Sequence, residues 1–143
     1  MLTTTKRKRD NQLDSGTKPQ GVAPDDVSLS DAHCDRRDYV ASICDGVIDI
    51  ASALFNVSGR ELRNPGRSPQ AVSRVRQIAM YVTHVTLHLS MRDVGQGFGR
   101  DRTTVLYACH QIEDLREDEE FDDIVARVER VVMVAFGLRG KQG

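Results

Sequence analysis

The segment from Phe98 to Ile112 carries the side chains best suited to binding another molecule. It joins a glycine-containing turn to an amphipathic helix whose outer face begins with Arg102 and Thr103. An arginine can donate two hydrogen bonds to guanine, and a threonine methyl group can pack on thymine. A helix that follows a tight turn offers such groups to the DNA major groove in helix-turn-helix proteins. The sequence therefore predicts a DNA-reading helix here, with Asp101 as its N-cap.

Charge is unevenly distributed along the 143-residue chain, whose formal net charge is −1. Residues 60–110 contain eight arginines and three acidic residues, a balance of +5. Residues 113–123 contain eight acidic residues and one arginine, a balance of −7. This asymmetry indicates one face that attracts phosphate and another that is turned away from it. Two ordinary solvated faces are the alternative interpretation.

Catalytic and metal-binding patterns are incomplete. His84 and His88 are spaced as in a zinc metalloprotease helix, but Val85 stands where that pattern needs a glutamate. The three cysteines lack the paired spacing of zinc sites or disulfide frameworks. No Gly-rich phosphate-binding loop ends in Lys-Ser or Lys-Thr, so ATP hydrolysis of the P-loop type is not expected. We therefore expect no enzymatic activity, no metal and no cofactor.

Three segments are predicted along the chain. Residues 1–36 are rich in Asp, Ser, Gly and Pro and lack sustained periodicity, which predicts a disordered arm whose basic cluster spans Lys6–Arg9. Residues 37–137 form the compact domain, and residues 138–143 form a tail. No apolar run resembles a signal peptide or a membrane span, so we expect a cytoplasmic, nucleoid-associated protein.

Helical periodicity predicts an all-α domain of about six helical elements that positions the DNA-reading helix. Capping patterns at Ser58, Ser68-Pro69 and Ser90 predict where three of these helices begin. The first helix is expected to bury Val40, Ile43, Val47, Ile50, Ala51 and Leu54. The helix after Ser68 is expected to bury Val72, Val75, Ala79, Val82 and Val85, and to expose Arg76, Gln77, Met80, Thr83 and His84.

The last two helices show the same periodicity. The DNA-reading helix is expected to bury Val105, Ala108, Cys109, Ile112 and Leu115, and to turn Arg102, Thr103, Leu106, Tyr107 and His110 outward. The final helix is expected to place Phe121, Ile124, Val125, Val128, Val131, Val132 and Ala135 on one stripe, and Gly137 ends it.

Several motifs resemble the C-terminal DNA-binding domain of the bacterial replication initiator DnaA. The resemblance covers residues 50–116 and, more loosely, 38–136. It is carried by Phe55-Asn56-Val57 with Glu61-Leu62, by Arg74 to Met80, by Gly95 to Phe98 and above all by Arg100 to Ala108, RDRTTVLYA. In that family a helix-turn-helix binds a short duplex element, and a basic loop reaches the neighbouring minor groove.

The resemblance implies roles for individual positions. Asp101, Arg102 and Thr103 match residues that approach base edges, and Thr104 and Tyr107 match a pair near the phosphates or the groove wall. Further expected DNA-binding residues are Arg67 in the basic loop, Arg76, Gln77 and His84 at the phosphate backbone, and Arg100 before the recognition helix. Asp101 as a simple N-cap, and Leu106 and Tyr107 as packing residues, are the alternative interpretations.

Two departures from the family pattern concern base recognition. Arg102 stands where the family usually has histidine, and Gly99 stands alone where the family has two glycines. The turn is therefore one residue shorter, and Arg102 should favour guanine, so we expect a preference for an element other than the usual one. His84 falls where the family often has lysine, which predicts a weaker or pH-dependent phosphate contact.

The sequence thus predicts a stand-alone, sequence-specific binder of double-stranded DNA that regulates transcription or modulates replication initiation. We expect a monomer or weak dimer that acts at more than one site, because one recognition helix reads few base pairs. The alternative is a protein-interaction module that docks on the replication initiator or the transcription machinery through its acidic segment or its arm.

Overall fold

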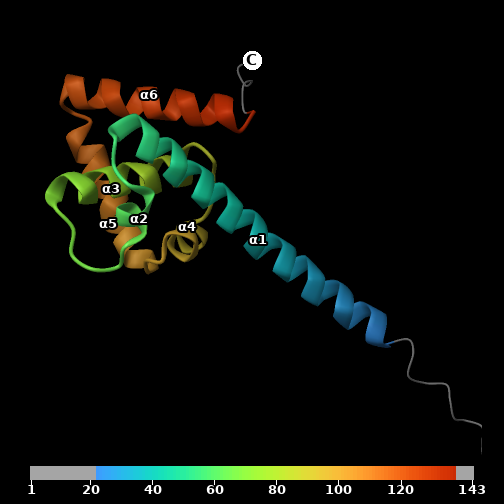
Figure 1. Cartoon of the computed structure of the whole chain (residues 1–143). Helices are drawn as coiled ribbons and strands as arrows, with labels where there is room; N and C mark the ends of the chain where they lie inside the picture. Colours follow the sequence, from blue (N-terminus) through green and yellow to red (C-terminus); the bar gives the residue numbers. More distant parts are fainter. Residues whose placement is uncertain (1–21, 138–143) are drawn as a thin grey trace, which may run out of the picture. The chain divides into compact units, whose positions relative to one another are not determined.

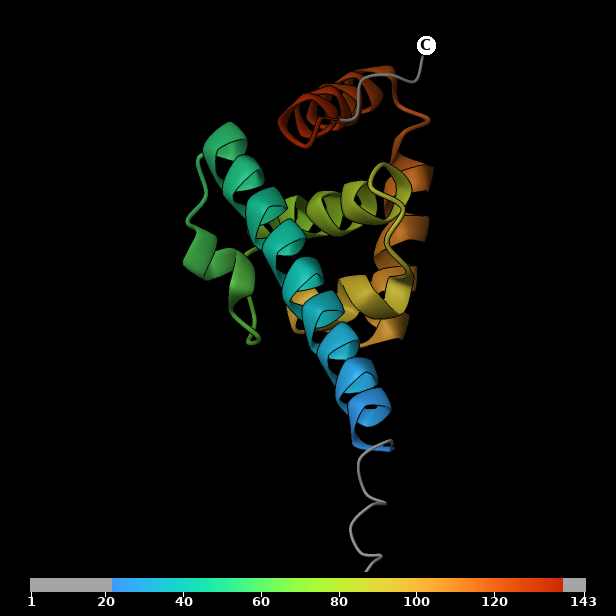
Figure 2. The same ribbon diagram turned by 90° about the vertical axis from the view of Figure 1, so that its right-hand side faces the viewer.

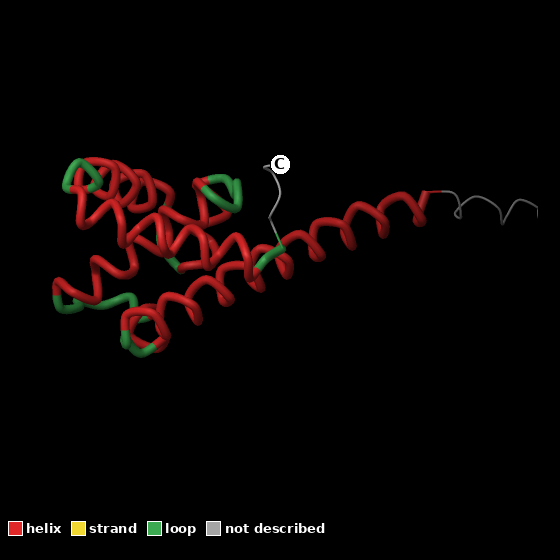
Figure 3. Tube along the Cα trace, turned by 90° about the horizontal axis from the view of Figure 1, so that it is seen from above, coloured by secondary structure: helices red, strands yellow, loops and turns green. Residues whose placement is uncertain are grey.

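The computed structural model describes residues 22–137, with side chains from Asp35 onward, and shows helices joined by loops (Figure 1). No strand occurs within this range, as Figure 3 also shows. The six helices are α1 (Val22–Phe55), α2 (Gly59–Arg63), α3 (Gln70–Val85), α4 (Met91–Phe98), α5 (Arg102–Leu115) and α6 (Glu119–Ala135). The prediction of an all-α domain with about six helical elements is confirmed.

Helix α1 begins earlier than the sequence predicted. The chain divides into two compact units between Asp38 and Tyr39, and α1 continues through this boundary. Residues 22–36, expected to belong to a disordered arm, are helical. Their lack of sustained apolar periodicity did not predict a helix, although Pro24 lies in the first turn, where its missing N–H costs no hydrogen bond. The basic cluster Lys6–Arg9 and the tail 138–143 lie outside the described residues.

The core of the second unit is built around α3, which packs against α2, α4, α5 and α6. Its hydrophobic side chains come from all six helices and include Val47 and Ala51 of α1 and Leu62 of α2. The predicted inward faces of α5 and α6 are largely confirmed. Their buried members are Val105, Ala108, Cys109, Ile112, Val125, Val128 and Val132.

Helix α3 differs from the prediction because it has no fully polar side. Arg76, Met80 and Thr83, expected to face outward, are buried. Thr83 satisfies its hydroxyl within the helix, since Oγ1 donates to the Ala79 carbonyl at 2.7 Å. Neighbours on several sides cover this helix, so a single-stripe interpretation of its periodicity was wrong.

Several residues that were expected to be buried are partly exposed. Val85, expected to face inward, is 38% exposed, and Leu54 is 48% exposed. On α6, Ile124 and Val131 are 40% and 39% exposed although they were assigned to the buried stripe. Val85 and Leu54 lie at the ends of α3 and α1, whereas Ile124 and Val131 lie within α6 next to the fully buried Val125 and Val132, at the edge of its buried stripe.

Serine and aspartate side chains begin most of the helices of the domain. Ser58 accepts hydrogen bonds from the amides of Arg60 and Glu61, and Ser90 accepts one from Asp93, as predicted. At α3 the N-cap is Pro69 and makes no side-chain cap, so the predicted Ser68 cap is wrong. Gly137 follows α6 with a φ of 73°, the left-handed conformation that glycine favours at a helix end.

An arginine joins α5 to α6 at the acidic end of the domain. Arg116 pairs with Asp122 at its Nε and with Glu129 at 3.0 Å from Nη1, and Nη1 also donates to the Tyr81 hydroxyl. Partial burial opposes the charge of Arg116, but hydrogen bonds to Asp122, Glu129 and Tyr81 outweigh burial and raise its pKa. Two carboxylates thus neutralise the single arginine of the acidic segment.

Candidate nucleic-acid interface

The N-terminal end of α5 is held by Asp101, the residue predicted to cap it. Oδ1 of Asp101 accepts hydrogen bonds from the Thr104 amide at 3.1 Å, from the Thr104 hydroxyl at 2.7 Å and from the Thr103 hydroxyl at 3.4 Å. The Thr104 side chain and amide stabilise the carboxylate and lower the pKa of Asp101. The cap therefore remains charged near neutral pH and fixes the start of the helix.

The outer face of α5 carries the predicted base-reading residues. Arg102, Thr103 and His110 are exposed, and Tyr107 is 60% exposed, whereas Leu106 is half-buried. Val105 and Ala108 lie between them in sequence and are buried. The helix thus packs by one face and presents a polar and aromatic face outward, which confirms the predicted division apart from Leu106.

The turn between α4 and α5 depends on two glycines. Gly99 ends α4 with a φ of 70°. A residue with a side chain would adopt this left-handed conformation only at a steric cost. A Cβ on Gly95 would lie 2.6 Å from the Arg100 carbonyl oxygen. The Arg100 amide in turn donates to the Gly95 carbonyl at 2.8 Å. The backbone of Arg100 is therefore fixed directly against α4.

The loop between α2 and α3, residues 64–69 and here called the basic loop, lies beside the start of α5 (Figures 1 and 2). Arg67 is exposed in this loop, as expected of a residue that reaches a second groove. Nη2 of Arg100 donates to the Asn64 carbonyl at 2.9 Å. Oδ1 of Asn64 accepts from the Gly66 amide at 3.0 Å, which is a local turn of the Asx type.

Arg76 was expected at the phosphate backbone, and the structure places it inside the protein. It is 7% exposed and is the single buried charged residue in the described part of the chain. Its Nε donates to the Leu62 carbonyl, and its Nη2 donates to the Glu61 carbonyl and the Ser68 hydroxyl, all at 2.9 Å. Burial, followed by the nearby charge of Arg100, lowers the pKa of Arg76.

Gln77 lies next to Arg76 on α3 and is half-buried. Its Oε1 accepts a hydrogen bond from Nη1 of Arg74 at 2.8 Å. The acceptor of this Arg74 hydrogen bond is therefore a neutral amide. Gln77 and Arg74 therefore form one polar pair near the basic loop.

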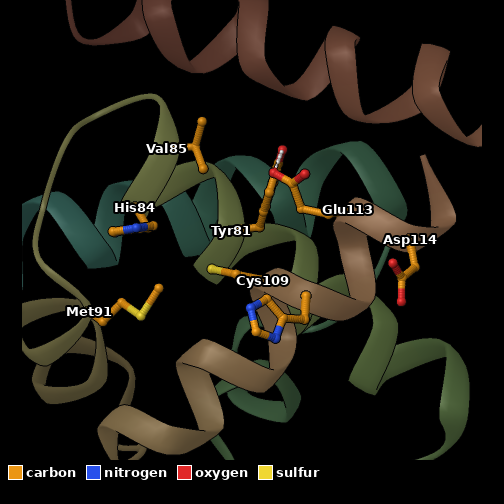
Figure 4. Close-up of a pocket in the computed structure, with 8 residues that line it drawn as sticks. Tyr81, His84, Val85, Met91, Cys109, Glu113 and Asp114 are labelled. Carbon is orange, nitrogen blue, oxygen red and sulfur yellow. Dashed lines mark hydrogen bonds between the residues drawn. The ribbon is translucent and has the colours of Figure 1, made fainter. Parts of the chain in front are cut away.

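A groove of about 500 Å³ lies beside α5, between the C-terminal end of α3 and the start of α4 (Figure 4). It is lined by Tyr81, His84, Val85, Met91, Cys109, His110, Glu113 and Asp114. His84, the expected phosphate contact, is half-buried at this groove. Its Nδ1 lies 2.8 Å from the Leu89 carbonyl oxygen, which can only accept, so Nδ1 carries a proton.

The described residues show no site for a metal ion, since no three His, Cys, Asp or Glu side chains gather suitably. Burial raises the pKa of the Cys44 thiol to about 12 and that of the Cys109 thiol to about 11. Within residues 22–137 no helix has both the length and the apolar character that crossing a bilayer requires.

Comparison with known proteins supports the DNA-binding interpretation of this geometry. Residues 44–112 match the family described as the bacterial dnaA protein helix-turn-helix. A stretch of 87 residues, 59% of the chain, is 36% identical to the chromosomal replication initiator protein DnaA of Mycobacteroides abscessus. The chain spans 18% of the length of that relative.

Residues 44–112 are therefore similar to a DnaA-type helix-turn-helix, and the domain that contains them is here called the DnaA-type domain. A crystal structure of a DNA replication initiation factor has the same fold, with a TM-score of 0.63 and 20% sequence identity. The match covers 73% of this chain and 32% of that one. The match includes α4, the turn and most of α5, and helix-turn-helix domains bind double-stranded DNA.

Sequence reasoning missed the internal contacts of the DnaA-type domain's basic loop. Asn64 was not singled out, although Asn64-Pro65-Gly66 is a turn signal that could have drawn attention to it. Ser68 was assigned to a cap, whereas its hydroxyl accepts from Arg76. No sequence signal indicates that Arg100 reaches a carbonyl 36 positions away.

Proposed function

We propose that the DnaA-type domain binds double-stranded DNA sequence-specifically, with α5 in the major groove and the basic loop at the neighbouring minor groove. The observation that supports this most directly is the exposed pair Arg102 and Thr103 at the capped N-terminal end of α5. A recognition helix places its N-terminal residues at base edges in this way. Arg67 is exposed on the adjacent loop and is proposed to enter the minor groove.

Base discrimination is assigned to Arg102 and Thr103. A bidentate contact of Arg102 to guanine, or the packing of the Thr103 methyl group on thymine, is worth about 1–3 kcal/mol of discrimination. The Thr103 hydroxyl donates within the protein, to Asp101, which leaves its methyl group for such packing. Asp101 acts mainly through the cap, and its two hydrogen-bonded threonines keep the start of α5 in one geometry.

Phosphate contacts are assigned to a second set of residues. Tyr107 and Thr104 lie on the exposed part of α5, and Gln77 and His84 lie on α3. Arg76 is proposed to support this surface from within, because its hydrogen bonds with Leu62, Glu61 and Ser68 are internal.

His84 offers a phosphate one ring nitrogen only. Because Nδ1 carries a proton toward Leu89, the uncharged imidazole has an unprotonated Nε2 that would repel a phosphate oxygen. Protonation of the ring converts Nε2 into a charged donor. Lysine would place a charged donor at this position, so the phosphate contact of His84 should be the weaker of the two.

The biological role we propose is regulation of transcription or modulation of replication initiation at sites related to initiator-binding elements. Arg102 and the short turn at Gly99 should give these sites a base preference different from that of the usual element. A single domain reads few base pairs, so we propose a monomer or weak dimer that acts at clustered sites.

Selection of random duplex oligonucleotides at about 150 mM salt tests the proposal. The native chain should enrich one motif, and Arg102→Glu should abolish that enrichment. Arg60→Glu is the matched control, because Arg60 is an exposed arginine at the start of α2 and the same charge is reversed there. If the native chain enriches nothing, or if both variants behave alike, base recognition by α5 is refuted.

The salt dependence of binding to the selected duplex tests the phosphate contacts. With roughly four to six phosphates neutralised, log affinity should fall with a slope of about −4 to −5 against log salt concentration. A flat response would contradict binding by the cationic surface. If the native chain selects no duplex but retains a protein partner, and Arg102→Glu retains the same partner, a protein-interaction module is favoured instead.

A further inference from the structure

We infer that Arg100 is a positioning residue that fixes the basic loop to the turn before α5, so that the minor-groove and major-groove contacts keep one spacing. The inference rests on the proposed function, because it concerns how the two DNA-contacting parts act together. Its starting point is the 2.9 Å hydrogen bond from Nη2 of Arg100 to the Asn64 carbonyl.

The basic loop is tied to the rest of the domain at both of its ends. Arg76 holds the carbonyls of Glu61 and Leu62 before the loop and the hydroxyl of Ser68 near its end. These bonds close the loop on α3. Arg100 belongs to the helix-turn-helix, and its guanidinium donates a hydrogen bond to the carbonyl of Asn64, the first residue of the loop.

The backbone of Arg100, in the turn before α5, is held in place. The Arg100 amide donates to the Gly95 carbonyl, and its own carbonyl lies where a Cβ on residue 95 would clash. The next residue, Asp101, caps α5. A displacement of the Arg100 backbone would therefore displace the start of the recognition helix, and the guanidinium transmits this position to the basic loop.

The acceptors of the two arginines are electrically neutral. Among the contacts of the described residues, Arg76 and Arg100 donate to carbonyl and hydroxyl oxygens and pair with no carboxylate. The basic loop is consequently positioned without loss of positive charge. This suits a surface that must meet phosphates, whereas ties made by Asp or Glu would repel them.

The positioning role predicts an effect confined to part of the DNA site. Arg67 lies three residues after Asn64, so release of Asn64 should let Arg67 move relative to α5. The base preference at the minor-groove flank should then relax, while preferences at the bases that α5 contacts should remain. A phosphate contact by Arg100 predicts a uniform loss of affinity across sequences instead.

The test uses Arg100→Gln, with Arg60→Gln as the matched loss of an exposed charge. Binding is measured to the selected duplex, to a duplex changed only in the flank and to one changed only under α5. We expect Arg100→Gln to reduce flank discrimination about fivefold or more, a loss of about 1 kcal/mol. Its discrimination under α5 and its salt slope should match those of the native chain and of Arg60→Gln.

A uniform loss of affinity with a salt slope weaker by about one unit would overturn the inference and leave the proposed function intact. If the native chain selects no motif, the proposed function fails first and the inference fails with it. Thermal unfolding without DNA checks that Arg100→Gln is folded. If it is not, Arg100→Met, which retains the aliphatic stem, replaces it in the same measurements.

A double-variant cycle supplies a second readout that a merely structural role would not change. An Arg67→Ala variant lacks the residue proposed to contact the minor-groove flank, so adding Arg100→Gln to it should cause no further loss of flank discrimination. Additive losses for Arg67→Ala and Arg100→Gln would show independent contacts and would overturn the positioning role.

Discussion

Arginine plays opposite parts at the two ends of the DnaA-type domain. At the acidic end, Arg116 pairs with Asp122 and Glu129 and contacts the Tyr81 hydroxyl. At the end with the recognition helix, Arg76 and Arg100 donate to neutral oxygens of the basic loop and its flanks. In the part of the chain that the structure describes, Arg76 and Arg100 meet no carboxylate, whereas Arg116 is neutralised by two, and Arg63, the residue before the basic loop, pairs with Asp45 at 3.0 Å.

The difference shows that the partner, not the residue type, determines what a charged side chain contributes. A guanidinium between two carboxylates joins helices and adds little to the field around the protein. A guanidinium on carbonyls joins segments equally well and keeps its positive field. Substitutions at the two ends should therefore affect stability and DNA binding in different proportions.

The largest expected effect on stability is at Arg76. Arg76→Ala removes the guanidinium donor of the buried Leu62 carbonyl, while the Glu61 carbonyl keeps the Asn64 amide, and the free energy of unfolding should fall by about 2–3 kcal/mol. Urea denaturation measures this change, with Arg60→Ala as the exposed control. A loss for Arg76→Ala no greater than that of Arg60→Ala would show that the buried hydrogen bonds do not hold the loop.

Arg116→Ala should destabilise the domain by about 1–2 kcal/mol, because Asp122 and Glu129 lose a shared partner that is only partly exposed. Affinities for different duplexes should keep their ratios. The comparison is made with Arg127→Ala, an exposed arginine of the same helix bundle end. A changed order of preferred DNA sequences in Arg116→Ala would contradict the division between the two ends.

His84→Lys should increase DNA affinity about fivefold near pH 8, a gain of about 1 kcal/mol. The lysine charge is present there, whereas the uncharged imidazole offers no donor at Nε2. His88→Lys adds the same charge at another exposed position, and an equal gain there would show only a general electrostatic effect.

The smallest expected effect concerns the Asp101 cap. Asn also caps helices well, so Asp101→Asn should change stability little at pH 7. The pKa of Asp101 is lowered in the folded domain, so its extra stabilisation is present above the ordinary carboxylate range, about pH 4. It is lost as pH falls through the lowered pKa. Thermal unfolding is measured between pH 6 and pH 3, and the unfolding temperatures of the native chain and of Asp101→Asn should converge as pH falls. A difference in unfolding temperature that stays constant would contradict the charged cap.

Local chemistry made much of the helix-turn-helix predictable. The Asp101 cap, the inward faces of Val105 and Ala108, and the helix-ending role of Gly99 follow from propensity, periodicity and backbone sterics. Each depends on residues within about one or two turns of each other. These are the features for which sequence and structure agree.

Contacts between distant segments were not predictable in the same way. The periodicity of α3 placed Arg76 and Met80 outside, because one helix alone cannot show how many neighbours surround it. The start of α1 was missed for the related reason that residues 22–36 have no stripe that a core must bury. Their helical conformation needs no apolar periodicity.

The sequence by itself determined the class of domain, the helix carrying Arg102 and Thr103, and the cap that begins it, since these depend on short-range sterics and hydrogen bonds. The tertiary structure alone decided that Arg76 is internal and that Arg100 reaches Asn64. A guanidinium can satisfy its donors with water, phosphate or backbone oxygens at similar cost. Which of these it meets depends on the chain segments that packing brings beside it.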